Sequence, residues 1–372
     1  MNIHQLFDEM IQRNASDLFI TVGFPASAKI DGEMVKIGNE PLDFQQVLTM
    51  IETLMNEDVK ANFHRHREAN FGYSGENEQA RFRISAFWQR DNPGMVVRSI
   101  QTRIPSMEEL FLPEVMKEIC MAKRGLVIMV GATGTGKSTS LAAMVGHRNR
   151  NSRGHILTIE DPIEFVHSHA QCIVTQREVG LDTESFEAAL QSSLRQAPDV
   201  ILLGEIRSQE TMEFALAFAE TGHLCMATLH ANNANQALER ISHLVAKDKH
   251  DQLMFDLSLN LRAVMAQQLV PRRDGNGRRV AIEVLINTPR VADLIAKGNM
   301  HLLKETMANS REQGMQTFDQ ALFDLYESGA ISYADALHHA DSPNDLRLAV
   351  KLQSNGGSGG GGFMDGVTVD LD

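Results

Sequence analysis

The first part of the chain mixes two patterns of apolar residues. One repeats every three to four positions and is typical of amphipathic helices, whereas the other alternates apolar with polar residues and is typical of strands. Together they predict a small α+β domain over residues 1–105. Its expected elements are an amphipathic stretch over 3–11, strands over 18–22, 28–30, 80–87 and 95–100, helical spacing over 44–66, a hairpin turn at Asp31-Gly32 and a turn at 91–94.

From about residue 119 the pattern changes to apolar strands that alternate with helices, which predicts a parallel sheet over residues 119–350. Residues 106–118 have no long apolar run and are interpreted as an interdomain linker. Residues 351–372 are rich in glycine, end in acidic residues and predict a flexible tail. The strands of the sheet are expected at 126–130, 155–159, 200–203, 224–229 and 280–286, and helices at 291–350.

A glycine-rich segment follows the first of these strands and matches the pattern G-x-x-x-x-G-K-[ST] without a gap. A strand before it and a helix after it are the context that a phosphate-binding loop requires. Lys137 is expected to reach the β- and γ-phosphates and Ser138 to hold Mg²⁺. The sequence therefore predicts binding of ATP or GTP, and the expected nucleotide-binding residues are Gly131, Ala132, Thr133, Gly134, Thr135, Gly136, Lys137, Ser138 and Thr139.

Acidic residues follow two other predicted strands. Glu205 comes just after the strand 200–203 and is the candidate for polarising the attacking water, although a solvated strand end is the plain alternative. Glu160 and Glu164 belong to an acidic segment whose like charges a divalent cation would relieve. Glu164 is the candidate Mg²⁺ ligand, and Asp161 is interpreted as a turn former in what could also be an exposed acidic turn.

His223 and His230 bracket the predicted strand 224–229. Their separation of seven residues places them on opposite faces of a regular strand, which disfavours a shared metal ion. Either histidine is a candidate for sensing the γ-phosphate from an end of the strand.

Arginines are the candidates for neutralising charge that develops at the γ-phosphate. Arg81 and Arg83 are two positions apart on a strand and face the same side, and Arg98 lies on the next strand. Arg207 follows Glu205 closely. These four are candidate arginine fingers, acting within the subunit or on an adjacent one, and a merely solvated basic face is the alternative.

Composition narrows the class of protein. Hydrophobic residues make up 43% of the chain, which excludes a disordered protein, and the lack of a long apolar stretch or signal-like start leads us to expect a cytoplasmic protein. The three cysteines, Cys120, Cys172 and Cys225, form no C-x-x-C pair and indicate reduced, buried thiols. A net charge of −13 weighs against a nucleic-acid translocase.

Four motifs in this order resemble the type II/IV secretion ATPase superfamily, which contains the hexameric motors of type IV pili and type II secretion. They are the phosphate loop, the acidic segment Thr158 to Glu164, the segment Leu203 to Arg207 and the segment Thr221 to Ala231 with its two histidines. The chain lacks the two C-x-x-C pairs of the assembly motors and resembles the PilT and PilU type of retraction motor. Residues 288–295 and the glycine-rich tail make it more similar to the PilU type.

The resemblance implies a PAS-like N-terminal domain joined to a RecA-like ATPase domain with C-terminal helices, assembled as a homohexamer that uses ATP and Mg²⁺. It implies hydrolysis by Glu164 and Glu205, a histidine box at His230 and arginine fingers from the small domain. The implied partners are a PilT-type paralogue and a PilC-like platform protein at the inner-membrane base of the pilus. A non-motor ATP-binding subunit that assists a partner ATPase is the alternative.

Overall fold

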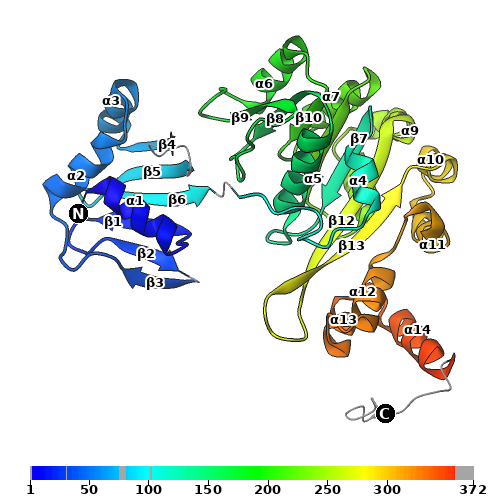
Figure 1. Cartoon of the computed structure of the whole chain (residues 1–372). Coiled ribbons are helices and arrows are strands. Elements are labelled where there is room, and N and C mark those ends of the chain that lie inside the picture. Colours follow the sequence, from blue (N-terminus) through cyan, green and yellow to red (C-terminus); the bar gives the residue numbers. More distant parts are fainter. Residues whose placement is uncertain (1, 31, 75–80, 101–102, 357–372) are drawn as a thin grey trace. The chain divides into compact units, whose positions relative to one another are not determined.

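The computed structural model describes residues 2–30, 32–74, 81–100 and 103–356 (Figure 1). The predicted turn residue Asp31, the first residue of the predicted strand 80–87 and most of the predicted tail lie outside these ranges. Cα packing divides the chain into two compact units, which we describe one at a time. Residues 1–109, 116–126 and 138–228 form the first unit, and residues 110–115, 127–137 and 229 onward form the second. The domain limits expected from the sequence stay a prediction.

The N-terminal part of the first unit is built on a six-stranded sheet in the order β3-β2-β1-β6-β5-β4. Every neighbouring pair in it is antiparallel. This confirms the α+β prediction for this region. Its elements are α1 (Ile3–Gln12), β1 (Asp17–Thr21), β2 (Ser27–Ile30), β3 (Glu33–Lys36), α2 (Phe44–Thr53), α3 (Glu57–His66), β4 (Glu68–Ser74), β5 (Arg81–Gln89) and β6 (Asn92–Ile100).

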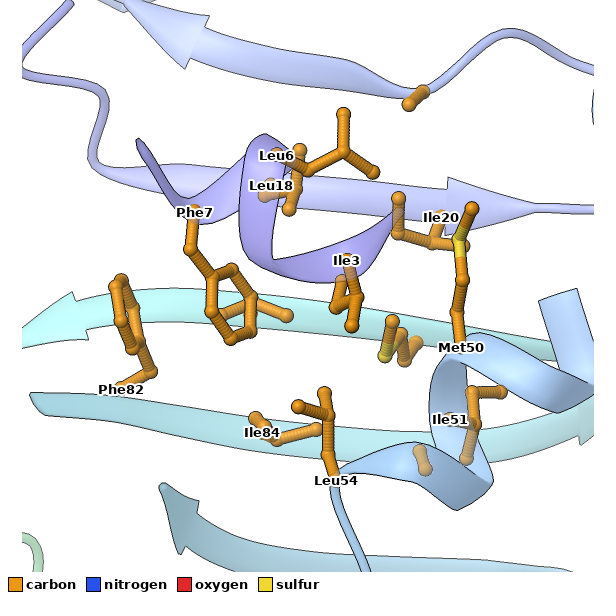
Figure 2. Packing of buried hydrophobic residues seen from close by; sticks show 14 of the residues in the cluster. Ile3, Leu6, Phe7, Leu18, Ile20, Met50, Ile51, Leu54, Phe82 and Ile84 are labelled. Atoms are coloured by element: carbon orange, nitrogen blue, oxygen red, sulfur yellow. The ribbon is translucent and has the colours of Figure 1, made fainter. Parts of the chain in front are cut away.

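The core of this part lies between helices α1 and α2 and the face of the sheet that β1 and β5 present (Figure 2). Phe7 of α1 stacks on Phe82 of β5 with ring centroids 4.3 Å apart. Burial of such aromatic and aliphatic side chains supplies most of the stability of a small domain. Figure 2 labels ten members of this cluster: Ile3, Leu6, Phe7, Leu18, Ile20, Met50, Ile51, Leu54, Phe82 and Ile84.

The helical spacing predicted over 44–66 is confirmed as the two helices α2 and α3, and Asn56 caps α3 by accepting a hydrogen bond from the backbone of Val59. One local prediction needs correction. The turn predicted at 91–94 lies at Arg90 and Asp91, which both have positive φ and leave Gln89 paired with Asn92. Two left-handed residues make the tight hairpin turn whose twist suits antiparallel strands.

The remaining strands form a seven-stranded sheet in the order β13-β12-β7-β11-β10-β8-β9. Strands β8, β9, β10 and β11 pair in parallel, as the alternating pattern predicts. The elements are α4 (Val115–Cys120), β7 (Gly125–Val130), α5 (Lys137–Asn151), β8 (Gly154–Glu160), β9 (Cys172–Glu178), α6 (Phe186–Ser193), β10 (Val200–Leu203), α7 (Gln209–Glu220), β11 (Leu224–Leu229), α8 (Ala234–Ser242), α9 (His250–Asn260), β12 (Leu261–Pro271) and β13 (Arg278–Ile286).

The sheet also departs from the prediction. Strand β13 pairs with β12 in antiparallel orientation, so the sheet is mixed. Its strands β9 and β12 were not predicted: β9 carries few apolar residues, and the apolar run of β12 continues directly from helix α9. In the six-stranded sheet β4 was likewise not predicted. Helix α4 begins inside the predicted linker. Mixed sheets with one antiparallel edge are common among α/β proteins.

The second unit ends in the helices predicted for residues 291–350. They are α10 (Pro289–Ala296), α11 (Leu303–Ala308), α12 (Phe318–Glu327), α13 (Tyr333–His339) and α14 (Pro343–Gly356). All three cysteines are buried free thiols, as expected. Within the part of the chain that the structure describes, no helix is both long and apolar enough to cross a membrane.

Replacement of Phe82 tests the core of the N-terminal part. We expect Phe82→Ala to lower the free energy of unfolding by about 3–5 kcal/mol, because it removes a buried ring and leaves a cavity. Urea unfolding followed by the emission of Trp88, the single tryptophan, measures the effect. Met34→Ala, at a side chain that is 56% exposed, is the control and should change stability by less than about 0.5 kcal/mol. Equal shifts for both variants would contradict this account of the core.

Candidate nucleotide site

The phosphate loop begins after the fully buried strand β7 and ends at the first turn of α5. Two of its glycines are required because neighbouring atoms leave no space for a side chain. A Cβ atom at Gly131 would lie 2.7 Å from the backbone oxygen of Gln267, and one at Gly136 would lie 2.9 Å from the Gln267 amide nitrogen. Gly136 also has φ of +85°, which side-chain-bearing residues rarely adopt. The sequence motif is therefore a geometric requirement of this loop.

Lys137 folds back over the loop that precedes it. Its ammonium group donates hydrogen bonds of 2.9 Å to the backbone oxygens of Gly131 and Ala132. The Thr135 hydroxyl donates to the same Ala132 oxygen at 2.9 Å. The loop thus places a cation beside backbone N–H groups at the start of a helix, which is the arrangement that binds polyphosphates in other proteins.

Gln267 of β12 is a site residue that the sequence analysis missed. Its side chain is 2% exposed, and its amide donates a 2.7 Å hydrogen bond to the backbone oxygen of Thr135. The bond fixes the loop from the side, because it holds a carbonyl group in the middle of the motif. The sequence offered one signal for this residue, a glutamine within an apolar run. Only the folded structure shows that its side chain contacts the phosphate loop.

The acidic candidates lie in the first unit, at the carboxyl ends of β8 and β10. These strands pair in parallel with Ile159 opposite Leu203, so Glu160 and Glu205 leave the sheet at the same edge. The carboxyl edge of a parallel sheet is where ligands bind in this class of fold. The structure therefore brings two of the predicted carboxylates to one edge.

Glu160 is held in place by two polar neighbours. Its Oε1 accepts hydrogen bonds from the Thr158 hydroxyl at 2.7 Å and from the Gln176 amide at 3.1 Å. Burial raises the pKa of the Glu160 carboxyl, and the two hydrogen bonds oppose that rise. Glu164 is exposed, as is Asp161 in the turn that connects the two glutamates.

Glu205 lies between two backbone anchors that both come from Thr228 of β11. The Thr228 hydroxyl donates to the oxygen of Gly204, and the backbone of Ile206 donates to the Thr228 oxygen at 2.9 Å. Thr228 is 8% exposed, so water competes little for these bonds. The backbone on both sides of the candidate catalytic carboxylate is therefore fixed by one residue.

Arg207, a predicted arginine finger, instead binds Glu205 within the same chain. Its Nε donates a 2.6 Å hydrogen bond to Oε2 of Glu205, and its Nη1 lies 3.9 Å from Oδ2 of Asp161. The hydrogen bond to Glu205 raises the pKa of Arg207 above its ordinary value. In this structure Arg207 neutralises the carboxylate that is expected to polarise water, and a role in a neighbouring subunit would require this bond to open.

The two histidines lie at opposite ends of β11, as expected from their positions on either side of the predicted strand. His230 follows the carboxyl end of the strand, on the edge that carries Glu205. His223 precedes the amino end, about 20 Å of strand away, and its Nδ1 lies 3.0 Å from the Thr221 hydroxyl. The geometry of one chain therefore supports His230 as a site residue and gives His223 a local structural setting.

The arginines of the N-terminal part lie as their spacing predicts. Phe82 and Ile84 are buried in the core, and Arg81 and Arg83 alternate with them on β5. Arg83 is directly opposite Arg98 in the strand register, and Arg98 binds Asp17 at 2.8 Å. Like charges opposed across two strands repel each other unless an anion lies beside them. Asp17 supplies part of that compensation.

The oxygen ligands that the protein offers to Mg²⁺ are few, and they suit the ion only together with nucleotide phosphates. Within residues 2–30, 32–74, 81–100 and 103–356, no three His, Cys, Asp or Glu side chains are arranged to hold a metal ion. Mg²⁺ is commonly held by one or two protein oxygens together with nucleotide phosphates and water. Ser138 and one carboxylate of the acidic segment provide such oxygens, so the residues present fit this mode.

Comparison with known proteins identifies the family. The model of the family described as "Type II/IV secretion system protein" matches residues 1–316. The chain belongs to this family. It is 60% identical over 354 residues to the type IV pilus ATPase PilU of Pseudomonas aeruginosa, which covers 95% of this chain and 92% of that protein. It is 39% identical over 346 residues to PilT of the same organism, over 93% of this chain and 100% of that protein.

Solved structures agree with the sequence relatives. A crystal structure of the pilus retraction motor PilT with bound ADP superposes with a TM-score of 0.86 at 36% identity, covering 94% of this chain and 99% of that one. The Legionella pneumophila ATPase DotB gives a TM-score of 0.72 at 25% identity, covering 93% and 96%. The predicted fold class, the predicted family and the prediction of a P-loop ATPase are confirmed. The greater similarity to the PilU type than to the PilT type is also confirmed.

Thr228 gives the sharpest test of the site. Thr228→Val keeps the shape but removes the hydroxyl that holds Gly204, so we expect kcat for ATP hydrolysis to fall roughly tenfold while KM changes less than about twofold. The lost bond should also lower stability by about 1 kcal/mol. Steady-state phosphate release and thermal unfolding measure the two effects.

The matched control is Thr306→Val, which removes a 2.9 Å hydroxyl bond to the backbone oxygen of Leu302 in the C-terminal helices. It should lose similar stability and keep its kcat. If both variants lose kcat in proportion to their loss of stability, the hydrogen bonds of Thr228 around Glu205 have no specific role in catalysis.

Proposed function

We propose that this protein is a hexameric ATP-driven motor of the type IV pilus machinery that drives or assists pilus retraction. The observation that carries the proposal is the joint presence of a complete phosphate loop, with Lys137 folded over it, and of Glu205 anchored at the carboxyl edge of the sheet. The similarity to PilU and PilT along nearly the whole chain supports the biological setting.

In the proposed site the loop binds ATP through its backbone N–H groups. Lys137 exchanges the oxygens of Gly131 and Ala132 for β- and γ-phosphate oxygens, which are stronger acceptors because they are charged. Bound Mg²⁺ would supply charge neutralisation at the phosphates, with Ser138 and Glu164 as its protein ligands. Glu205 orients and polarises the attacking water once its carboxylate leaves Arg207.

The arginines Arg81, Arg83 and Arg98 are proposed to act on nucleotide as fingers from the N-terminal part of the same or a neighbouring subunit. Three guanidinium groups on adjacent strands give a local positive surface on a chain whose net charge is −13. Such a surface suits a polyanion such as triphosphate. Closure of the N-terminal part around ATP and its release after hydrolysis would provide the mechanical step.

The proposed partners follow from the family. A PilT-type paralogue is the expected companion motor, and a PilC-like platform protein at the inner-membrane base of the pilus is the expected load. The protein would then work in the cytoplasm, against that base. Binding to each partner is testable by co-purification from cells that carry pili.

Two substitutions test the assignment of binding and cleavage to different residues. Lys137→Ala should abolish ATP binding, whereas Glu205→Gln should bind ATP normally and cleave it about 100-fold or more slowly. Fluorescent-ATP binding and phosphate release by the purified ring measure the two steps. Glu184→Gln, at an exposed glutamate, is the control and should behave as the wild type. Normal turnover by either site variant would refute the assignment.

The alternative is a non-motor subunit that binds ATP and assists a partner ATPase. One observation favours this alternative: Arg207 binds the Glu205 carboxylate that hydrolysis needs. Pilus retraction in cells that lack the PilT-type partner separates the two: retraction that requires Glu205 supports the motor, and its complete absence supports the accessory role.

A further inference from the structure

The acidic segment that carries Glu164 is held by side chains of the neighbouring strand β9. Residues 161–171 connect β8 to β9 and belong to no helix or strand. Their backbone groups lack the regular partners of a helix or sheet, so those that are buried need other partners. Gln176 and Glu178 of β9 supply such partners for three backbone groups.

Gln176 uses its whole side-chain amide in this way. Its Nε2 donates hydrogen bonds to the backbone oxygen of Phe165 at 2.9 Å and to Oε1 of Glu160 at 3.1 Å. Its Oε1 accepts a hydrogen bond of 2.7 Å from the backbone of His167. A neutral amide donates two bonds at one end and accepts at the other, whereas a carboxylate at this position could donate none. The amide is therefore matched to its three partners.

Glu178 holds the same segment from a position two residues further along β9. It is 3% exposed, and its Oε2 accepts a 3.2 Å hydrogen bond from the backbone of Ile163, which is 1% exposed. In the strand register Gln176 is opposite Thr158 and Glu178 is opposite Glu160. Because residues two apart on a strand lie on the same face, all four side chains share one face of the sheet.

Glu164 lies between the residues that these bonds hold. Glu178 binds the backbone of Ile163 on one side of it, and Gln176 binds the backbone of Phe165 on the other. The Glu164 side chain itself is exposed. Its backbone is therefore anchored on both sides while its carboxylate faces solvent. Ligands in metal sites are commonly oriented in this way by neighbours that do not touch the metal.

We propose that Gln176 is a positioning residue that fixes the backbone of the acidic segment and so sets where Glu164 presents its carboxylate to Mg²⁺ and ATP. The proposal rests on the proposed function, which assigns Glu164 to Mg²⁺. Gln176 acts through the segment, because its own amide is occupied by Glu160, Phe165 and His167. Loss of the amide lets the segment move without removing a group of the phosphate loop.

Asn149 of α5 provides a matched control at the other end of the same connection. It is 4% exposed, and its side-chain amide donates to the backbone oxygen of Ser168 at 2.8 Å. The amide oxygen accepts from the backbones of Ala170 and Cys172 at 3.2 and 3.3 Å. Asn149 thus also makes three side-chain hydrogen bonds to the chain around it, but to residues beyond the acidic segment.

The kinetic test compares Gln176→Met with Asn149→Leu, each of which replaces an amide by an apolar side chain of similar size. We expect Gln176→Met to lower kcat about tenfold and to change the KM for ATP less than about twofold, because Glu164 is displaced while the phosphate loop is intact. Asn149→Leu should lose at least as much thermal stability and keep its kcat within about twofold of wild type.

A double-mutant cycle decides whether Gln176 acts through Glu164. In the Glu164→Gln background the carboxylate that needs positioning is already gone, so adding Gln176→Met should lower kcat by less than about twofold further. A residue with an independent role would lower kcat by the same factor in both backgrounds.

A second variant keeps the test open if Gln176→Met does not fold. Gln176→Glu keeps the size of the side chain and an acceptor for His167, but it cannot donate to Phe165. It should reproduce the loss of kcat and the small change in KM.

Residue-resolved hydrogen exchange of the protein without nucleotide or metal tests the anchoring itself. In Gln176→Met the amide of His167 loses its acceptor. The amide of Ile163 keeps its acceptor Glu178, yet it should also exchange at least about threefold faster, because the segment opens more often. In Asn149→Leu the faster exchange should be confined to residues 168–172.

Four results would overturn the proposal: an unchanged kcat in Gln176→Met, an equal loss of kcat in Asn149→Leu, a full further loss in the Glu164→Gln background, or exchange that changes at His167 alone. If Glu164→Gln hydrolyses ATP as fast as wild type, the role of Glu164 in the proposed function fails instead. The exchange measurements would still decide whether Gln176 anchors the acidic segment.

Discussion

The close approach of the phosphate loop to Gln267 is the constraint on which the second unit depends. Gly131 and Gly136 leave no room for a side chain there, and Gln267 binds the loop backbone in the middle of the motif. The next residue, Gln268, lies 3.3 Å from Nδ1 of His339 on α13. Strand β12 therefore contacts the phosphate loop with one residue and the C-terminal helices with the next.

The candidate carboxylate Glu205 and its anchors lie in the first unit. Thr228 fixes the backbone on both sides of Glu205, and Arg207 neutralises the carboxylate. Residues 131–137 of the phosphate loop belong to the second unit, whereas Ser138 belongs to the first unit together with Glu205. Each unit contains an anchor of its own. Gln267 holds the phosphate loop in the second unit, and Thr228 holds the backbone around Glu205 in the first.

The sequence predicted the parts of the fold that depend on local patterns. The phosphate loop, the strands 200–203 and 224–229 and the alternation of Arg81 and Arg83 all follow from spacing along one element. What it could not predict depends on pairing between distant segments. The polar strand β9, the anchoring role of Gln267 and the intrachain bond of Arg207 to Glu205 become visible only when the chain is folded.

Two charged contacts define the state described here: Lys137 on the loop oxygens and Arg207 on Glu205. The central claim is that nucleotide replaces the first contact and opens the second. A crystal structure of the protein with Mg²⁺, ADP and aluminium fluoride tests it most directly. The account predicts that the Lys137 ammonium leaves the Gly131 and Ala132 oxygens for phosphate and that Glu205 turns from Arg207 toward the attacking water. Nucleotide bound with both contacts intact would contradict the account.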